Sequence, residues 1–339
     1  MIDAVIPVDL SRRPIDLLRR LKRLLPALRA QGLGVVVGHN ERRTVFDRLL
    51  KKLCARENAR LVSGQFYDHA VNNALLRNKA IAAVDAPLAV LLDADLYVPP
   101  STIPAVARRV HAGEVPFSVL PCLYLSRKGS SRLVGGKESP TRLFESYLAY
   151  RRASYLHMAL PSSVTVFRTG DFAAAGAFDE RFTGHGYEDL DFLVRLGWLH
   201  AVVPRSQSLL VDLPSQAPLL ATGFRSYLAR LALPALLNGE IAFHLWHSTS
   251  RDAYYGARAD NAKHFESKLF REIRPTIARD HTAVDQADFD IELIQAYLDI
   301  CRTYKKNPRD YTVLFDNRPG HVDRLDTLGR KLRFLMNAY

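Results

Sequence analysis

The stretch that decides the fold of this chain is 88–95, Leu-Ala-Val-Leu-Leu-Asp-Ala-Asp. Five consecutive apolar residues without polar alternation are typical of a parallel strand that is buried on both faces of its sheet. The run ends in Asp93 and Asp95. Ligands of open α/β sheets bind beyond the carboxyl ends of the strands, so both aspartates are expected to face a crevice. The stretch therefore predicts an α/β fold with a functional site at this strand end.

Strand and helix patterns alternate on both sides of this stretch, which supports the α/β class. Upstream, strands are predicted at 4–8, 32–38 and 60–63, and helices at 12–29, 44–56 and 69–84. Downstream, a helix is predicted at 101–112 and a strand at 117–125, followed by a mobile loop, rich in Gly, Ser and basic residues, at 126–140. After about residue 261, long amphipathic helices are predicted at 263–279, 289–305 and 322–337. We therefore expect one domain at 1–260 and a helical extension at 261–339.

The net positive charge of the chain favours anionic partners, but it does not indicate which kind. The 339 residues carry a formal net charge of +12, which attracts nucleic acid, anionic lipid or phosphorylated small molecules. No RNA-recognition, zinc-finger or basic-zipper signature accompanies this charge, so no nucleic-acid partner is predicted. The basic helix at 12–29 interleaves arginine and lysine with leucine. Its basic side is predicted to be a solvent face, in preference to a membrane-surface helix.

Cysteine content and hydropathy predict a cytoplasmic location. Cys54, Cys122 and Cys301 are far apart and odd in number, so neither a disulfide framework nor a Cys-x-x-Cys motif is present. The first residues lack the long apolar run of a signal peptide. The longest apolar region, 227–246, is interrupted by charged residues and a proline, and so does not predict a membrane span.

Asp93 and Asp95 form the first candidate site. On an extended strand, residues two apart point the same way, so both carboxylates are expected to address one target. A divalent ion that carries a diphosphate suits them, since carboxylate and phosphate oxygens together complete its coordination shell. The alternative is an aspartate pair that only caps the following helix near Ser101.

A second candidate site is the segment 243–248, Phe-His-Leu-Trp-His-Ser. Histidine added to carboxylates shifts metal preference from Mg²⁺ toward Mn²⁺ or another first-row ion. Histidines three apart share a face on a helix, whereas on a strand they point to opposite sides and only one could be a ligand. The alternative, two ordinary histidines beside Phe243 and Trp246, is disfavoured for His247 and stays open for His244.

A third candidate site is 184–191, Gly-His-Gly-Tyr-Glu-Asp-Leu-Asp, a loop that delivers a helix starting near Glu188. Acidic residues in a first helical turn are favoured by the helix dipole, which is a structural explanation for them. A carboxylate placed there, beside flexible glycines, is also a positioned general base for an acceptor hydroxyl. The two roles are compatible.

These motifs together resemble GT-A glycosyltransferases, over roughly residues 4 to 260. The most specific part is Phe-Asp-Glu-x-Phe-x-Gly-x-Gly-x-Glu-Asp-x-Asp at 178–191, supported by Asp-x-Asp at 93–95 and His-x-x-His-Ser at 244–248. The resemblance is strongest to the group of the β-1,4-galactosyltransferases and bacterial chondroitin-type polymerases. It implies a nucleotide-sugar half at about 1–125, an acceptor half at about 140–260, a donor that is usually a UDP-sugar, Mn²⁺ or Mg²⁺, and inversion at the anomeric carbon.

The resemblance also implies a role for each matched residue. Asp95 and His247 would bind the metal, with His244 where a weaker ligand can sit, and Ser248, Arg251 and Asp252 would complete the tract. Asp189 matches the catalytic base and Glu188 an acceptor-contacting partner. The donor would be contacted by Pro7, Val8, Asp9, Arg12, Arg77, Lys79 and Asp93. The acceptor would be contacted by Gly186, Tyr187, Glu188 and Asp191, although Asp191 is also explained as a helix start.

The function predicted is transfer of a hexosyl or N-acetylhexosaminyl group to a glycan or lipid-linked acceptor, in synthesis of bacterial capsule or another surface polysaccharide. The gap between Asp191 and His247 is long and is expected to hold an inserted helical piece that shapes the acceptor site. Peripheral contact with the inner membrane or with capsule-assembly proteins is a further expectation. The alternative is a non-catalytic scaffold that binds nucleotide sugar or glycan on the same fold.

Overall fold

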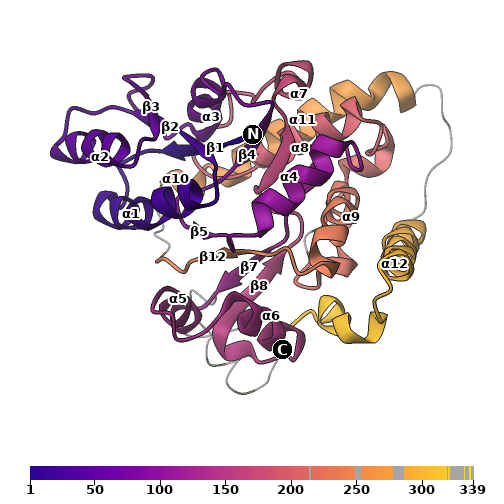
Figure 1. The fold of residues 1–339 in the computed structure, drawn as a ribbon. Coiled ribbons are helices and arrows are strands. Elements are labelled where there is room, and N and C mark those ends of the chain that lie inside the picture. Colours follow the sequence, from indigo (N-terminus) through magenta and orange to yellow (C-terminus); the bar gives the residue numbers. More distant parts are fainter. Residues whose placement is uncertain are drawn as a thin grey trace.

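The computed structural model describes residues 1–213, 215–248, 253–277 and 286–318, with the single positions 320, 332 and 336. Two sheets form its centre (Figure 1). The larger has the order β3-β2-β1-β4-β9-β6 and the smaller the order β5-β12-β7-β8. The larger consists of β1 (Ile2–Val8), β2 (Gly34–Asn40), β3 (Arg60–Gly64), β4 (Leu88–Leu91), β6 (Ser118–Val119) and β9 (Thr165–Arg168). The smaller consists of β5 (Leu96–Tyr97), β7 (Cys122–Leu125), β8 (Tyr155–Ala159) and β12 (Ala242–His244).

The larger sheet is mostly parallel. β1 pairs in parallel with β2 and β4, and β2 with β3, whereas β9 runs antiparallel to β4 and β6. A separate ribbon pairs β10 (Asp212–Leu213) with β11 (Thr222–Gly223). The mixed α/β class with a mostly parallel sheet, predicted from the buried run at 88–92, is confirmed.

Helices cover both faces of the larger sheet because its strands are apolar on both sides. On β1, Val5 belongs to one hydrophobic cluster and its neighbour Ile6 to the other. The cluster of Ile6 takes in leucines of α1 (Pro14–Ala30) and α2 (Val45–Arg56) and apolar residues of α4 (Thr102–Ala112). The cluster of Val5 takes in residues of α3 (Asn73–Ile81), α7 (Thr169–Ala174) and α8 (Glu188–Leu199).

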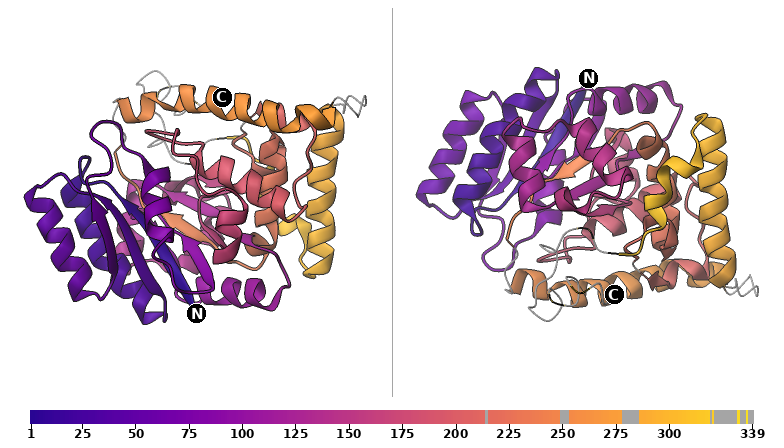
Figure 2. Two further views of the ribbon diagram at one scale, coloured as in Figure 1. Left: turned by 90° about the horizontal axis from the view of Figure 1, so that it is seen from above. Right: turned by 90° about the horizontal axis from the view of Figure 1, so that it is seen from below.

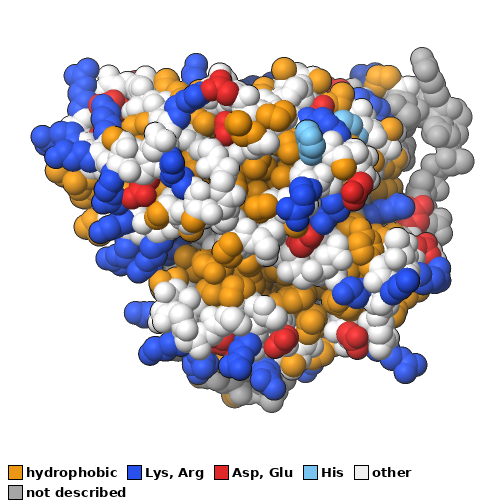
Figure 3. Space-filling view, in the orientation of Figure 1, with side chains coloured by type: hydrophobic (Ala, Val, Ile, Leu, Met, Phe, Trp, Pro, Cys, Tyr) orange, Lys and Arg blue, Asp and Glu red, His pale blue; other side chains and the backbone are white. Residues whose placement is uncertain are grey.

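The helix predicted at 12–29 is α1, and its basic side is a solvent face as expected. Leu21, Leu24, Leu25 and Leu28 are buried, whereas Arg19, Lys22 and Arg23 are exposed. Basic side chains gather on the side of the molecule where α1 and α2 lie (Figure 3).

Two predictions between residues 117 and 140 are wrong. The predicted strand 117–125 is split at Pro121 into β6 and β7, which lie in different sheets. The predicted mobile loop contains α5 (Arg127–Val134) and the start of α6 (Pro140–Leu148). Two of its four serines are helix caps, since Ser126 and Ser139 accept hydrogen bonds from backbone amides three residues on. A composition rich in Gly and Ser therefore marked helix boundaries here.

The second half of the chain is mainly helical. The gap after Asp191 holds α9 (Phe224–Leu237), which confirms the helical piece expected there. α10 (Ala253–Gly256), α11 (Arg258–Ile277) and α12 (Gln286–Thr303) follow. In the described part of the chain, 3₁₀ helices lie at Arg152–Ser154, Gln207–Leu210, Pro218–Leu220 and Pro308–Phe315. α12 packs against α9, at the end of the molecule opposite α1 and α2 (Figure 2).

The predicted domain boundary at residue 260 falls inside α11. The helix predicted at 322–337 lies outside the described residues, apart from two single positions. Among the helices that the structure describes, none has the length and apolar character needed to cross a membrane.

Candidate active site

A cavity of about 310 Å³ lies where the chain leaves β1 and β4, facing the loop before α8 and the segment after β12. Residues that lie more than 200 positions apart in the sequence meet in it. The predicted site residues that line the cavity are Pro7, Val8, Asp9, Arg12, Arg77, Asp93, Asp95, Gly186, Tyr187, Glu188, Asp189, His244 and His247. All three candidate sites are thus parts of a single cavity.

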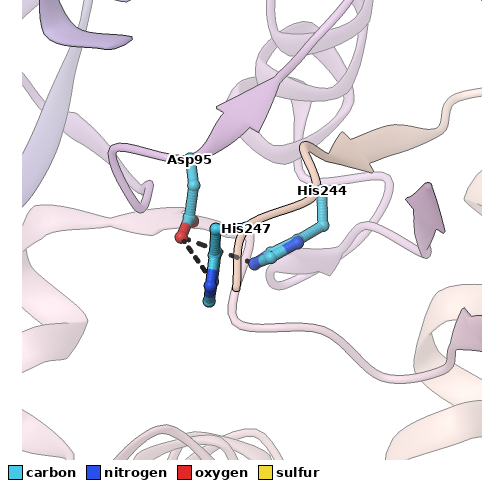
Figure 4. A group of neighbouring side chains, drawn as sticks. All are labelled: Asp95, His244 and His247. Carbon is cyan, nitrogen blue, oxygen red and sulfur yellow. Dashed lines mark ion pairs between the residues drawn. The ribbon is translucent and has the colours of Figure 1, made fainter. Parts of the chain in front are cut away.

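Asp95, His244 and His247 form a three-residue cluster in this cavity (Figure 4). The Nε2 atoms of His244 and His247 lie 3.5 Å and 3.3 Å from Oδ2 of Asp95. The ligand atoms of the three residues all lie within 4.8 Å of one another. Strand pairing brings them together, because β5 and β12 are antiparallel neighbours with His244 opposite Leu96.

Both histidines face Asp95 because β12 ends at His244. The amide of Leu245 donates a 2.8 Å hydrogen bond to the carbonyl of Asp95. Arg20, from α1, donates to the carbonyls of Leu245 and Trp246 at 3.3 and 2.9 Å. The amide of Trp246 donates to Oγ of Ser130 in α5, at 2.7 Å. These bonds turn the chain, so the rule that strand alternation separates the two rings does not apply.

The charge of the cluster suits a divalent metal. Burial by itself would raise the pKa of Asp95, but the two histidines outweigh it and hold that pKa well below its ordinary value. One carboxylate oxygen and two imidazole nitrogens are donors that first-row ions such as Mn²⁺ accept. The side chains are only 12% to 16% exposed, so little water competes for these donors. The residues therefore fit the metal that the sequence predicted.

Arg77 links Asp93, after β4, to Glu188 at the start of α8. Its side chain is buried, and it contacts Oδ1 of Asp93 at 2.8 Å and Oε1 of Glu188 at 3.0 Å. Asp93 also accepts a 3.0 Å hydrogen bond from Ser163. Asp93 and Asp95 therefore have different partners, unlike the single target expected from strand alternation. The reason is that β4 ends at Leu91, and the chain turns at Ala94 and Asp95, between the two carboxylates.

The three acidic residues of α8 differ in environment. Burial raises the pKa of Glu188 to about 7, and the neighbouring carboxylate of Asp189 adds to this, although Arg77 opposes it. Asp189 is half-buried and lines the cavity. Asp191 is buried away from the cavity lining, where it contacts Arg195 at 2.6 Å and Lys268 at 2.8 Å. These ion pairs give Asp191 a structural role in holding α8.

Asp9 is held at the carboxyl end of β1. Its carboxylate accepts hydrogen bonds from the Ser11 amide and the Tyr67 hydroxyl, both at 2.7 Å, and from Arg42 at 3.3 Å. Burial would raise its pKa, but these bonds together lower it, so Asp9 is ionised at neutral pH.

The other predicted site residues either lie away from the cavity or fall at the edge of the described residues or beyond it. Lys79 is exposed, with its ammonium 5.6 Å from the ring centre of Phe66, and does not line the cavity. Ser248 is described directly after His247, whereas Arg251 and Asp252 lie outside the described residues.

Several lining residues were not expected from the sequence. They come from four separate segments, and they are Arg13, Tyr124, Ser163, Tyr254, Tyr255 and Arg258. The Tyr254-Tyr255 pair near the histidine segment was the available signal, because tyrosine combines an apolar ring with a polar hydroxyl and is enriched at binding surfaces. The ring of Tyr254 lies 4.0 Å from the guanidinium carbon of Arg12.

The family of the chain follows from its sequence match over the residues that build this cavity. Residues 40–272, more than half of the chain, match the family described as "Glycosyltransferase like family 2". The chain belongs to this glycosyltransferase family. Its mostly parallel sheet with flanking helices is the GT-A architecture, as predicted. The narrower group of galactosyltransferases and chondroitin-type polymerases stays a prediction. No curated protein shows significant similarity to this glycosyltransferase.

Solved structures with similar folds are distant in sequence. S. aureus TarS 1-349 in complex with UDP-GlcNAc is 13% identical, over 98% of this chain and 80% of that one, with a TM-score of 0.43. Glucosyl-3-phosphoglycerate synthase from Mycobacterium tuberculosis, with Mn²⁺, UDP and glucosyl-3-phosphoglycerate, is 12% identical over 80% and 79%, with a TM-score of 0.36. A β-1,4-galactosyltransferase 7 from Drosophila, with manganese, UDP-Gal and xylobiose, is 15% identical over 59% and 61%, with a TM-score of 0.31.

Proposed function

We propose that this glycosyltransferase moves a sugar from a UDP-linked donor to a hydroxyl of a glycan or lipid-linked acceptor, with a divalent metal and with inversion. The observation that carries the proposal is the shared cavity, which is lined by a carboxylate-histidine cluster and by the Glu188-Asp189 pair, and in which Arg77 contacts both Asp93 and Glu188. One end of such a cavity suits a diphosphate, and the other suits a hydroxyl that must lose a proton.

The donor is proposed to lie across the ends of β1 and β4. Nucleotides bind in α/β folds at the carboxyl edge of the parallel strands, where Pro7, Val8 and Asp9 line the cavity. Asp9 would accept hydrogen bonds from the nucleoside, and Arg12 would face the phosphates. Asp93, fixed by Arg77 and Ser163, would contact the ribose or the sugar.

The metal would be held by Asp95, His247 and His244. When bound, a divalent ion supplies positive charge that stabilises the departing diphosphate. Asp95 and the histidines would fix the ion at one end of the cavity, and the turn after β12 would fix the histidines.

Asp189 is proposed as the general base. Among the described residues, none forms an ion pair with its carboxylate, whereas Glu188 is engaged by Arg77. A base needs a carboxylate oxygen that is free to accept a proton from the substrate, which favours Asp189 over its neighbour. Asp189 would take the acceptor proton while the acceptor oxygen bonds to the anomeric carbon and the bond to the diphosphate breaks. A single displacement of this kind inverts the anomeric carbon.

The acceptor and the biological setting are inferred from the resemblance described above. The enzyme would transfer a hexosyl or N-acetylhexosaminyl group onto a growing surface polysaccharide such as capsule. It would contact the membrane or other assembly proteins. A cytoplasmic location belongs to the same proposal.

The test is release of UDP from a panel of UDP-sugars, with Mn²⁺ and a set of glycan acceptors. We expect release that depends on both Mn²⁺ and acceptor, and that stops with a chelator. Asp95→Asn and His247→Ala should remove metal-dependent release, with Lys263→Ala, an exposed site on α11, as the control. Release that survives the chelator would contradict the metal assignment. UDP-sugar binding without any acceptor-dependent release would instead favour a non-catalytic scaffold.

A further inference from the structure

Arg258 differs from three other arginines of the cavity in its charge partners. It is the first residue of α11 and is exposed, and none of the described carboxylates forms an ion pair with it. Three other lining arginines each have acidic partners, which are Asp16 and Asp95 for Arg13, Asp93 and Glu188 for Arg77, and Asp212 for Arg225. Arg258 therefore presents a positive charge to the cavity.

Arg258 lies against the loop that leads into the acidic pair. Its guanidinium carbon is 5.1 Å from the ring centre of Tyr187. A Cβ atom added to Gly186 would lie 2.5 Å from its Nη1 atom, so glycine at this position leaves room for the guanidinium. Gly186 and Tyr187 directly precede Glu188 and Asp189. The positive charge is thus on the side of the cavity where the acceptor hydroxyl would react.

Aromatic rings complete this side of the cavity. The ring centre of His185 lies 5.6 Å from that of Tyr254 and 5.0 Å from that of Tyr255. Burial, followed by the charge of Arg258, lowers the pKa of His185 to about 4, so this ring is neutral at pH 7. The positive charges near this ring are therefore Arg258, beside the loop, and Arg12, which lies against Tyr254 and Tyr255.

The donor end of the cavity has its own charge balance. Asp95 and the histidines would hold a cation, and that cation would neutralise the negative charge of the diphosphate. Arg258 is not needed to neutralise the diphosphate. A guanidinium without an acidic partner binds carboxylate and phosphate groups well, because it donates two parallel hydrogen bonds. Given the proposed function, on which this inference rests, we propose that the acceptor carries an anionic group, a carboxylate or a phosphate, which Arg258 binds while Tyr254 and Tyr255 contact the sugar ring.

The inference is tested by binding of matched sugars to the whole protein loaded with UDP and Mn²⁺. Methyl glucuronide is compared with methyl glucoside, and glucose 6-phosphate with glucose, so that the two pairs distinguish a carboxylate from a phosphate. We expect at least one anionic sugar to bind about tenfold more tightly than its neutral partner. Arg258→Gln should reduce this preference to about parity, and Arg258→Lys should keep part of it.

UDP binding in the presence of Mn²⁺ is measured for wild type and both variants. The exposed guanidinium holds no ion pair in the described chain, so both variants should fold and should bind UDP as wild type does. Equal binding of anionic and neutral sugars would overturn the inference alone. Loss of UDP affinity in Arg258→Gln would also overturn it, since the arginine would then serve the donor. Wild-type protein that binds no UDP would overturn the proposed function, and the inference with it.

Discussion

Arg77 separates the roles of two adjacent carboxylates. Its guanidinium contacts Glu188 and Asp93, and leaves Asp189 as the carboxylate that faces the cavity without an ion pair in the described chain. A buried arginine with two acidic partners is held in one orientation, and breaking such a set leaves an uncompensated buried charge. At the scale of single residues, Arg77 therefore decides which carboxylate is held and which is left for the proposed reaction. It lies 111 positions before Glu188 in the sequence.

Replacement of the proposed base should remove catalysis and spare binding. In Asp189→Asn the amide cannot accept the acceptor proton, so we expect the rate of transfer to fall about 1,000-fold. Affinity for UDP with Mn²⁺ should be unchanged, because Asp189 is not one of the metal-binding residues. Initial rates of UDP release and UDP titration measure the two effects, with the exposed Asp310→Asn as a matched control. Near-normal transfer by Asp189→Asn would show that another group is the base.

Glu188 should make the stability of the protein depend on pH. Its pKa in the folded chain is raised from 4.5 to about 7, so the folded state holds the proton more tightly than the unfolded state. Its contribution to stability is therefore present at low pH and is lost as pH rises toward 7. Glu188→Gln cannot ionise and should lack this loss. We expect its free energy of unfolding, relative to wild type, to rise by on the order of 2 kcal/mol between pH 5 and pH 8. Denaturant titrations that give parallel curves for the two proteins would contradict this.

At the scale of elements, α11 holds the loop that carries the acidic pair. The side-chain amide of Asn261 donates to the carbonyls of Thr183, His185 and Gly186, at 2.9, 3.4 and 3.0 Å. Asn261 is buried, and one turn further along α11 the ring of Phe265 packs against Tyr187. The helical extension predicted from sequence therefore holds the loop that precedes Glu188 and Asp189, which its amphipathic pattern did not indicate.

Asn261→Ala should loosen this loop. The three carbonyls would lose their donor in a buried setting, so we expect a loss of about 2 kcal/mol in the free energy of unfolding. We also expect kcat to fall about tenfold with the KM for the donor unchanged, because the donor binds at another part of the cavity. Ser267→Ala, an exposed site on the same helix, is the control. A fall in stability with kcat unchanged would show that Asn261 is only structural.

α5 supports the metal cluster from behind. The amide of Trp246, which lies between the two histidines, donates to Oγ of Ser130. Ser130→Ala removes this acceptor and should let the histidine segment move, so we expect affinity for Mn²⁺ to fall about tenfold. The exposed Ser131→Ala removes the same group from the solvent side of α5 and should bind Mn²⁺ as wild type does. Equal Mn²⁺ affinity for all three proteins, measured by calorimetry, would contradict the role given to Ser130.

At the scale of the whole molecule, the residues of the proposed metal site come from the two sheets. Asp95 lies between β4 of the larger sheet and β5 of the smaller, and His244 ends β12 of the smaller. An ion bound to both would link them. A ligand that binds only the folded state adds about 2.7 kcal/mol at a hundred times its Kd, so saturating Mn²⁺ should raise Tm by about 5 °C. Thermal melting should show no such rise for His247→Ala, and an equal rise in both proteins would place the ion elsewhere.

Features of the site that depend on neighbouring residues could be predicted from sequence, whereas features that depend on distant residues could not. Local signals were sufficient for the buried strand before Asp93, the start of α8 at Glu188 and the basic face of α1, since periodicity and helix dipoles act within a few residues. The loop predicted at 126–140 was wrong because serine and glycine favour helix caps as well as loops. The orientation of His247 could not be predicted, because the turn after β12 depends on Arg20 and Ser130, which lie more than 100 positions upstream.

Sequence alone was sufficient for the α/β class, for the order of strands and helices as far as β4, and for the residue types of the proposed metal cluster and the acidic pair. It was sufficient because apolar periodicity and motif spacing are local properties of the chain. Only the tertiary structure decided which carboxylate meets which cation. It paired Asp95 with two histidines and Arg77 with Asp93 and Glu188, turned Asp191 away from the cavity, and left Arg258 without a described acidic partner. The physical reason is that charges interact through space, over distances that strand pairing and helix packing set.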